Sequence, residues 1–239
     1  MLLCAWNAIG SYAPATGKER RSMAPLEKRL AILLDWCRSY RIVADIGSGQ
    51  GRLARALAHQ GHRVLATEKT VSGWQELVQY TKTFEQIDPI LGDGLKPLLA
   101  MDVAIDVAVV AGMGPRAIER IVQQDSQFRR IPAFIVQPMQ GLFRMRRYLK
   151  NESWFVRQAD LVQEHGKLYG MWWVERNADN GAGLFSEWFP SEFLDSPLYP
   201  QLIRSRLAQL NQSLGHHTAQ CPMWDDWQRE RNALLTTLR

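Results

Sequence analysis

Length, composition and charge narrow the function classes that are open to this chain. Its 239 residues, of which 46% are hydrophobic, suffice for one ordinary α/β domain with an appendage and for a sizeable core. No apolar run approaches the about 20 residues that a membrane span requires. Residues 1–183 hold 24 basic and 18 acidic side chains, whereas residues 184–239 hold 5 and 6, so a polyanion is expected to bind the first part of the chain.

The first residues and the cysteines carry no sign of an exported or metal-binding protein. Residues 1–22 show no regular pattern and are predicted to be a flexible extension, unless translation begins at Met23. Their apolar start is too short for a secretory signal and lacks its basic leader. Cys4, Cys37 and Cys221 are odd in number and far apart, which argues against a disulfide framework and a metal site. We therefore expect a cytoplasmic protein without a bound metal.

A helix and a buried strand open the patterned part of the chain. Leucines at helical spacing after Pro25 predict a helix that ends near Arg38. The apolar, β-branched run Ile42–Ile46 predicts a buried parallel strand. A glycine-rich turn and a second helical pattern, which ends at about Gly61, follow directly. In such a strand–turn–helix unit, a ligand can bind at the carboxyl end of the strand and contact the free N–H groups at the start of the helix.

The turn after this strand indicates which nucleotide-like ligand fits. A dinucleotide fingerprint needs G-x-G-x-x-G, but Arg52 stands where the third glycine belongs. The pattern is instead Asp-x-Gly-x-Gly-x-Gly, which runs from Asp45 through Gly47 and Gly49 to Gly51. A carboxylate at the strand end suits the ammonium of a methionine moiety and would repel a pyrophosphate. We therefore predict S-adenosylmethionine (SAM) as the ligand; a purely structural strand-to-helix turn is the alternative.

The following strand and turn supply two further acidic candidates. Arg63–Thr67 is predicted to be the second strand, and Glu68 closes it, 23 residues after Asp45. That spacing is near the about 20 residues expected for a carboxylate that binds ribose hydroxyls; an ordinary acid at a helix start is the alternative. Asp93, in the turn Leu91–Leu95, is either an acceptor for an adenine amino group or a plain turn carboxylate.

The order of the remaining elements predicts the fold class. They are a helix over Val71–Phe84, strands over Pro89–Leu91, Ala104–Ala111 and Ala133–Val136, a helix from Pro115 to about Gln124, a basic helix after Gly141, and a hairpin of Trp154–Val162 with Leu168–Glu175. Alternating strands and helices that end in two adjacent strands describe a doubly wound, Rossmann-like α/β sheet with an antiparallel edge. Residues 23–176 would form this domain.

The rest of the chain predicts a connector and a helical appendage. Residues 177–197 are rich in Gly, Asn, Asp, Ser and Pro and are predicted to be the connector. Two apolar stripes at helical spacing follow, one before and one after residues 215–220. We expect residues 198–239 to form an antiparallel helical hairpin.

The order of these motifs resembles that of one known family, the bacterial tRNA (adenine-N1)-methyltransferases that modify position 22 (TrmK type). The matching pieces are Leu26–Leu30, Ala44–Ser48, Leu91–Leu95, Ala111–Gly114, Gln137-Pro138 and Gly166–Tyr169. The Ala-Gly-Met-Gly turn and the Gln-Pro pair are the more specific of them, because most SAM-dependent methyltransferases share the first glycine turn. The tail Pro190–Arg239 resembles the family's C-terminal helical hairpin more loosely, and the chain would be a divergent member.

The resemblance implies a class I SAM-dependent methyltransferase domain, with a helical hairpin that helps to hold tRNA. Asp45, Gly47 and Gly49 would line the methionine side, Glu68 would take the ribose, and Asp93 with Gly94 the adenine. Ala111, Gly112 and Met113 would lie beneath the methyl group. With Ser48 and Gly51 from the first turn, these eleven residues are the predicted cofactor site.

Three departures from the family pattern leave the substrate open. Residues 49–52 replace its usual Asp-His-Ala-Tyr, which moves the turn towards the general SAM-binding pattern. Pro115 replaces a glycine and Met139 an asparagine, where the target base should lie. Losing the asparagine removes a donor and an acceptor for an adenine edge. The alternatives are a methyltransferase with another RNA or a small-molecule acceptor, and a non-catalytic tRNA-binding relative.

Methylation of adenine N1 requires positioning more than acid–base chemistry. The neutral N1 carries a lone pair, so the protein has mainly to align it with the methyl carbon and the sulfur of SAM, after the base is extruded. Gln137 is the candidate for positioning the base edge; the alternative is a strand-end glutamine bonded to the backbone. Basic side chains on both sides of the fifth strand are predicted to contact phosphates near the site; a solvated helix face and loop is the alternative. These side chains are Arg129, Arg130, Arg144, Arg147 and Lys150. We expect a monomer.

Overall fold

The computed structural model describes residues 25–101, 103–176 and 190–237. The predicted N-terminal extension and most of the predicted connector lie outside these residues. The helices are α1 (Lys28–Trp36), α2 (Arg52–His59), α3 (Val71–Thr81), α4 (Lys96–Leu99), α5 (Pro115–Gln123), α6 (Leu142–Asn151), α7 (Tyr199–His216) and α8 (Trp224–Thr237), with the 3-10 turn η2 (Ser191–Phe193). The strands are β1 (Ile42–Ile46), β2 (Arg63–Glu68), β3 (Ile87–Leu91), β4 (Val107–Met113), β5 (Ala133–Pro138), β6 (Phe155–Glu164) and β7 (Lys167–Glu175).

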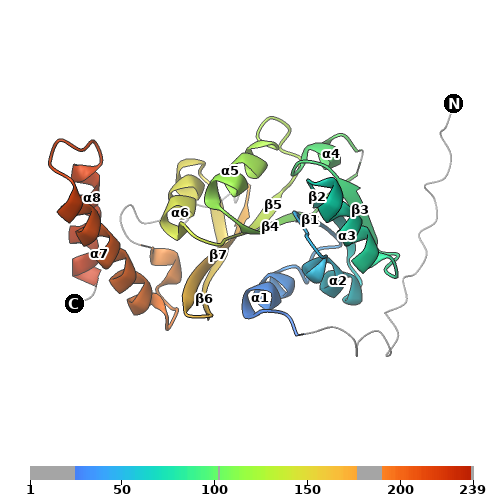
Figure 1. The fold of residues 1–239 in the computed structure, drawn as a ribbon, viewed down its shortest axis with the longest axis horizontal. Coiled ribbons are helices and arrows are strands. Elements are labelled where there is room, and N and C mark those ends of the chain that lie inside the picture. The colour runs from blue at the N-terminus through green and yellow to red at the C-terminus, as the bar shows by residue number, and fades with distance from the viewer. Residues whose placement is uncertain (1–24, 102, 177–189, 238–239) are drawn as a thin grey trace.

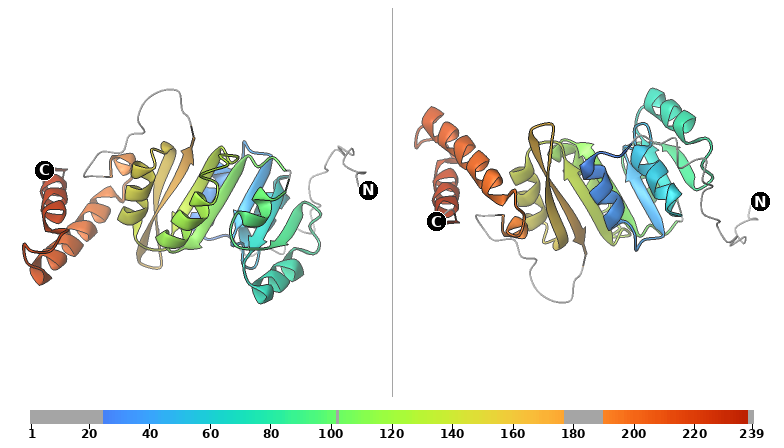
Figure 2. Two further views of the ribbon diagram at one scale, coloured as in Figure 1. Left: turned by 90° about the horizontal axis from the view of Figure 1, so that it is seen from above. Right: turned by 90° about the horizontal axis from the view of Figure 1, so that it is seen from below.

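One seven-stranded sheet forms the centre of the molecule, in the order β3-β2-β1-β4-β5-β7-β6. The first five strands are parallel, and β7 and β6 are antiparallel to their neighbours. Helices α1, α2 and α3 cover one face of the sheet, and α4, α5 and α6 the other (Figures 1 and 2). The predicted doubly wound, Rossmann-like sheet with an antiparallel edge is confirmed.

Several of the predicted strands have different limits in the structure, and two of them, β4 and β3, show a physical reason. The central strand was expected over Ala104–Ala111, but β4 begins at Val107 and continues to Met113. Before it, the carboxylate of Asp106 accepts the backbone N–H groups of Arg41 and Ile42, each at 2.8 Å, so residue 106 caps the start of β1. β3 begins at Ile87, two residues before the predicted start, because an edge strand tolerates a proline.

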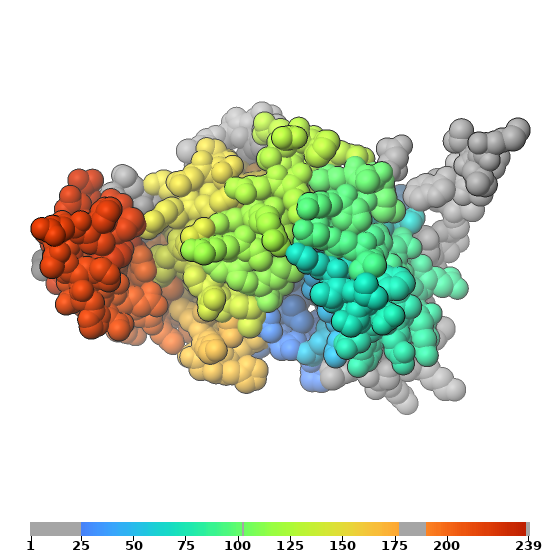
Figure 3. All heavy atoms as spheres, turned by 45° about the horizontal axis from the view of Figure 1, so that its top comes forward, coloured from blue at the N-terminus to red at the C-terminus, as the bar shows by residue number. Residues whose placement is uncertain are grey.

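The C-terminal helices form the predicted antiparallel pair. Arg206 in the middle of α7 binds both carboxylate oxygens of Glu230, at 2.7 and 2.8 Å, whereas His217, just after α7, contacts Trp227, near the start of α8. They project from one end of the sheet as a lobe beside α6 (Figure 3). Within the described ranges no helix is both long enough and apolar enough to cross a membrane.

The end of the predicted connector is packed against the sheet domain. Phe193 of η2 is 1% exposed and lies in the same core as Trp172 of β7. The carboxylate of its neighbour Glu192 accepts hydrogen bonds from Nε of the buried Arg146, at 3.0 Å, and from Nε1 of Trp172, at 3.2 Å. Residues 190–193 therefore fasten the helical pair to the sheet domain.

Candidate functional site

The candidate site lies at the carboxyl ends of the parallel strands. Parallel strands bring these ends to one edge of the sheet, and ligands of doubly wound folds bind there. We call the ends of the five parallel strands, β1 to β5, with the turns that follow them, the carboxyl edge. The predicted residues Asp45, Glu68, Met113 and Gln137 all lie on these strand ends.

The glycine turn after β1 has the conformation that its sequence predicts. Gly47, Gly49 and Gly51 have φ values of +70°, +55° and +69°, which L-residues with side chains adopt only with strain. The N–H groups of Gly47 and Ser48 both donate to the carbonyl of Thr67, at 2.8 and 3.0 Å, which fixes the turn to β2. A Cβ added at Gly49 would meet no atom of the described residues within 4 Å, so this part of the turn faces open space among them.

The carboxylates of Asp45 and Glu68 both accept hydrogen bonds from residues of this turn. The carboxylate of Asp45, 5% exposed, accepts Oγ of Ser48 at 2.6 Å and the backbone N–H of Ala54. Burial raises the pKa of Asp45 to about 6; the two hydrogen bonds oppose this rise, and the charge of Glu68 adds to it. Glu68 accepts N–H groups from Gly49 at 3.3 Å and Lys69 at 2.9 Å. The two carboxylates therefore both bind the glycine turn.

Asp93 lies farther along the same edge, among cations. Lys69 and Lys96 approach its carboxylate to 3.4 Å and Arg120 to 3.6 Å. Partial burial acts in the opposite direction, but the hydrogen bond of Lys96 and the charges of Lys69 and Arg120 together hold the pKa of Asp93 below its usual range. The carboxylate is therefore an ionised acceptor, as a contact with an amino group requires.

The segment Ala111–Met113 contains a β-bulge that brings β4 to the turn. The register of β4 against β5 shifts between Ala111 and Met113, and Gly112 has a φ of +76°. The side chain of Met113 reaches the glycine turn, since a Cβ at Gly47 would lie 2.1 Å from its Cε. Within the part of the chain that the structure describes, no atom lies within 4 Å of a Cβ built at Gly112, so the bulge also faces open space.

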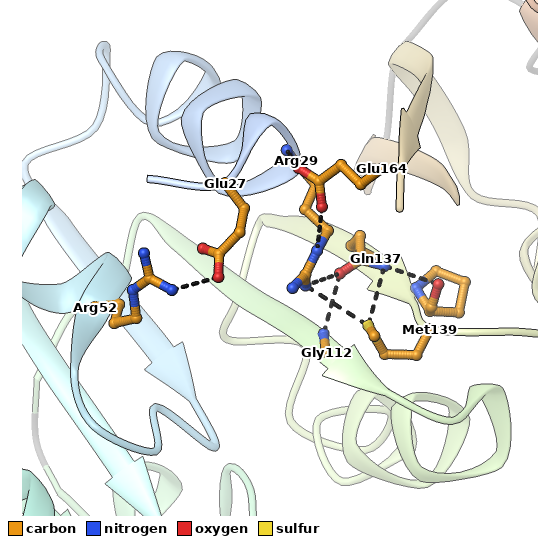
Figure 4. Close-up of polar contacts among 8 residues, drawn as sticks. Glu27, Arg29, Arg52, Gly112, Gln137, Met139 and Glu164 are labelled. Atoms are coloured by element: carbon orange, nitrogen blue, oxygen red, sulfur yellow. Dashed lines mark hydrogen bonds and ion pairs between the residues drawn. The ribbon is translucent and has the colours of Figure 1, made fainter. Parts of the chain in front are cut away.

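Gln137 is fully buried beneath this bulge. Its Oε1 accepts the N–H of Gly112 at 3.2 Å and Nη1 of Arg29 at 3.3 Å, while its Nε2 donates to the carbonyl of Pro138 at 2.8 Å (Figure 4). Both ends of the amide are thus engaged within the protein. This geometry favours the structural alternative for Gln137, and its role in reading a base stays a prediction without direct support.

Two of the five basic candidates do not lie at the site. Arg129 and Arg130 precede β5, so they lie at its amino end, on the opposite edge of the sheet. Arg130 donates to the carbonyls of Leu99 and Met101, at 3.0 and 3.2 Å, in the connection before β4. Their predicted position near the site is wrong, because residues that precede a parallel strand lie at its amino end, and the site lies at the carboxyl ends.

The other three candidates, Arg144, Arg147 and Lys150, follow the carboxyl end of β5 on α6. Arg144 pairs with Glu119 through two bonds of 2.8 and 2.7 Å, and Arg147 is exposed. Beside them runs a groove of about 750 Å³ between α6, the β6–β7 hairpin and α7, which begins at residues 138–141 of the carboxyl edge. Its basic lining includes Arg144, Arg147, Lys167 and Arg206. The sequence did not predict this groove, because its walls come from segments far apart in the chain.

Gly51 offers a test of how rigidly the turn is built. An alanine there would keep a positive φ and place its Cβ 2.8 Å from Thr81 Cγ2 and 3.0 Å from Leu77 Cδ1, both in buried side chains. We expect Gly51→Ala to lower the free energy of unfolding by about 2–3 kcal/mol, from backbone strain and overpacking together. Gly49→Ala is the matched control and should lose only about 1 kcal/mol. Equal losses in chemical denaturation would contradict this account.

Comparisons with known proteins give a consistent picture. The family described as "Methyltransferase domain" matches residues 26–172. A Mycoplasma genitalium protein named "Putative tRNA methyltransferase" is 25% identical over 155 residues, which are 63% of this chain and 70% of that protein. Among solved structures, M. capricolum TrmK in complex with S-adenosyl-homocysteine has a TM-score of 0.75 at 17% identity, over 89% of this chain and 97% of that one. A Streptococcus pneumoniae protein, titled a "putative tRNA (m1A22) methyltransferase" in complex with S-adenosyl-L-methionine, has a TM-score of 0.72 at 22% identity, over 90% and 100%.

Proposed function

The chain belongs to the methyltransferase-domain family, and from that premise we propose that it transfers the methyl group of SAM to N1 of an adenosine in tRNA. The observation that carries the proposal is the carboxyl edge itself. An open glycine turn, two carboxylates and the bulge of β4 meet there, beside a basic groove. Family membership agrees with the methyltransferase predicted from the motifs.

The residues of the carboxyl edge fit the parts of SAM. Asp45 and the turn would hold the methionine moiety, Glu68 the ribose hydroxyls, and Asp93 with Gly94 the adenine. SAM, when bound, supplies an electrophilic methyl group. Because the lone pair of N1 forms the new bond while the S–C pair stays on sulfur, no side chain has to remove a proton. The protein contributes alignment and the exclusion of water.

The nucleic-acid side of the proposal rests on charge and on position. The groove begins at residues 138–141 beside the bulge and runs along the basic face of α6. tRNA is the proposed partner because the similar proteins named above carry tRNA methyltransferase names. We also propose that the protein acts in the cytoplasm and as a monomer. Residues 23–176 are the proposed catalytic unit.

The function is tested by incubating the protein with SAM and a bulk tRNA pool, followed by mass spectrometry of the tRNA nucleosides. We expect N1-methyladenosine to appear, and to be absent without SAM. Methylation of small molecules alone would assign another acceptor. Binding of SAM without transfer to any RNA would indicate a non-catalytic relative, for which the departures Pro115 and Met139 are the first residues to revert.

Arg147 tests whether the groove takes up phosphates. It is exposed on α6 and lines the groove. We expect Arg147→Ala to weaken tRNA binding about 3–10-fold and to reduce the slope of log K against log salt by about 1. Arg129→Ala removes an exposed arginine at the opposite edge of the sheet and is the matched control. Filter binding at several salt concentrations measures both; equal effects would place the RNA elsewhere.

A further inference from the structure

One carboxylate from the β6–β7 hairpin holds the start of α1 against the carboxyl edge. Glu164 is the last residue of β6. Its carboxylate accepts two hydrogen bonds from Arg29, one from the backbone N–H and one from Nε, each at 2.9 Å. The side chain of Glu164 is 7% exposed and that of Arg29 17%. The carboxylate therefore satisfies a free N–H group in the first turn of α1 and binds the guanidinium of the same residue.

The guanidinium extends this contact to the bulge of β4. Nη1 of Arg29 donates to Oε1 of Gln137, which also accepts the N–H of Gly112 (Figure 4). One continuous set of hydrogen bonds thus connects the end of β6, the start of α1, the end of β5 and the bulge. These segments are up to 135 residues apart in the chain.

The start of α1 is held on its other side as well. Glu27, which directly precedes α1, pairs with Arg52 at the start of α2, next to the glycine turn (Figure 4). The guanidinium of Arg29 also lies 5.7 Å from the ring centre of Tyr169. Its position beside the bulge is therefore determined by several contacts, unlike that of Arg38, which follows the C-terminal end of α1 and whose pair with Asp35 is exposed.

A fixed, largely buried cation at this position affects which ligand can bind. Under the proposed function, the sulfonium of SAM lies above Ala111–Met113, and a guanidinium whose charge is not offset would repel it. We propose that Glu164 is a positioning residue for SAM, which offsets the charge of Arg29 beside the bulge and so permits a sulfonium to bind there. The inference rests on the proposed function.

The test compares a charged with a neutral ligand, because S-adenosyl-homocysteine has a thioether in place of the sulfonium. In Glu164→Gln we expect the Kd of SAM, measured by calorimetry, to rise about tenfold and that of S-adenosyl-homocysteine by less than about threefold. Asp35→Asn is the matched control, since it removes the carboxylate partner of Arg38, just after α1, and should leave the ratio of the two Kd values unchanged.

Further variants separate charge from structure. The double variant Arg29→Gln, Glu164→Gln should restore the wild-type ratio, and Glu164→Asp, which keeps the charge, should retain it even if the melting temperature falls. Arg29→Gln alone should shift the ratio in favour of SAM, and this result decides the matter if Glu164→Gln does not fold. Equal weakening of both ligands, or a ratio that the double variant leaves altered, would overturn the proposal. A wild-type protein that binds neither ligand would overturn the proposed function instead.

Discussion

Glu192→Ala is expected to lower the free energy of unfolding by about 3–5 kcal/mol, because it removes one partner of a buried ion pair. The side chains of Arg146 and Glu192 are 7% and 2% exposed, and their N–O distance is 3.0 Å. Burial raises the pKa of Glu192 although Arg146 lies beside it. The intact pair therefore adds little net stability, since its attraction mainly offsets the loss of hydration, whereas breaking it leaves that loss without compensation.

Asp88→Ala is the matched control for this variant. Asp88 pairs with Arg63 at 2.9 Å, almost the same distance, but these side chains are 43% and 35% exposed. Solvent screens such a pair, so we expect its loss to change the free energy of unfolding by less than about 1 kcal/mol. Urea denaturation measures both variants. If both lose similar amounts, burial of the pair does not fasten η2 to the sheet domain as we infer.

Local signals in the sequence were sufficient for the central part of the fold. The run Ile42–Ile46 and the glycines after it predicted β1 and its turn correctly, because apolar patterning and positive φ values are properties of neighbouring residues. The limits of β4 were missed because Asp106 acts on Arg41 and Ile42, about 65 residues away. Hydrogen bonds between distant segments leave no pattern in the chain.

The same distinction applies to the site. Asp45 and Glu68 both bind the glycine turn, since each lies at or next to the end of one of two neighbouring parallel strands. Glu164 was not predicted, because its partner Arg29 lies 135 residues away. The error for Arg129 and Arg130 was avoidable from the sequence alone: residues that precede a parallel strand lie at the edge opposite to those that follow it.

Asp45→Asn is expected to weaken SAM binding about 100-fold at pH 7.5, because it removes the charge that faces the proposed ammonium of the ligand. The same change should stabilise the protein without ligand. The pKa of Asp45 is raised by burial from its ordinary 3.8 to about 6, so the folded state binds this proton more tightly than the unfolded state does. The protonated Asp45 therefore adds about 3 kcal/mol to the free energy of unfolding below about pH 4, near the pKa of the unfolded state. This contribution is lost as the pH rises through the folded-state pKa of about 6. At pH 7, Asp45→Asn should recover up to that amount in thermal or urea unfolding.

Binding of SAM should also release a proton from Asp45 in this pH range. An ammonium beside the carboxylate favours its ionised form and lowers its pKa, so the Kd should rise as the pH falls below about 6. Calorimetry at pH 6 in two buffers of different ionisation enthalpy counts the released protons. Asp93→Asn is the matched control: the pKa of Asp93 is held below its usual range, so this variant should lose affinity and still release the proton. Asp45→Asn should lose both the affinity and the proton release. Proton release that persists in Asp45→Asn would show that another group faces the ammonium.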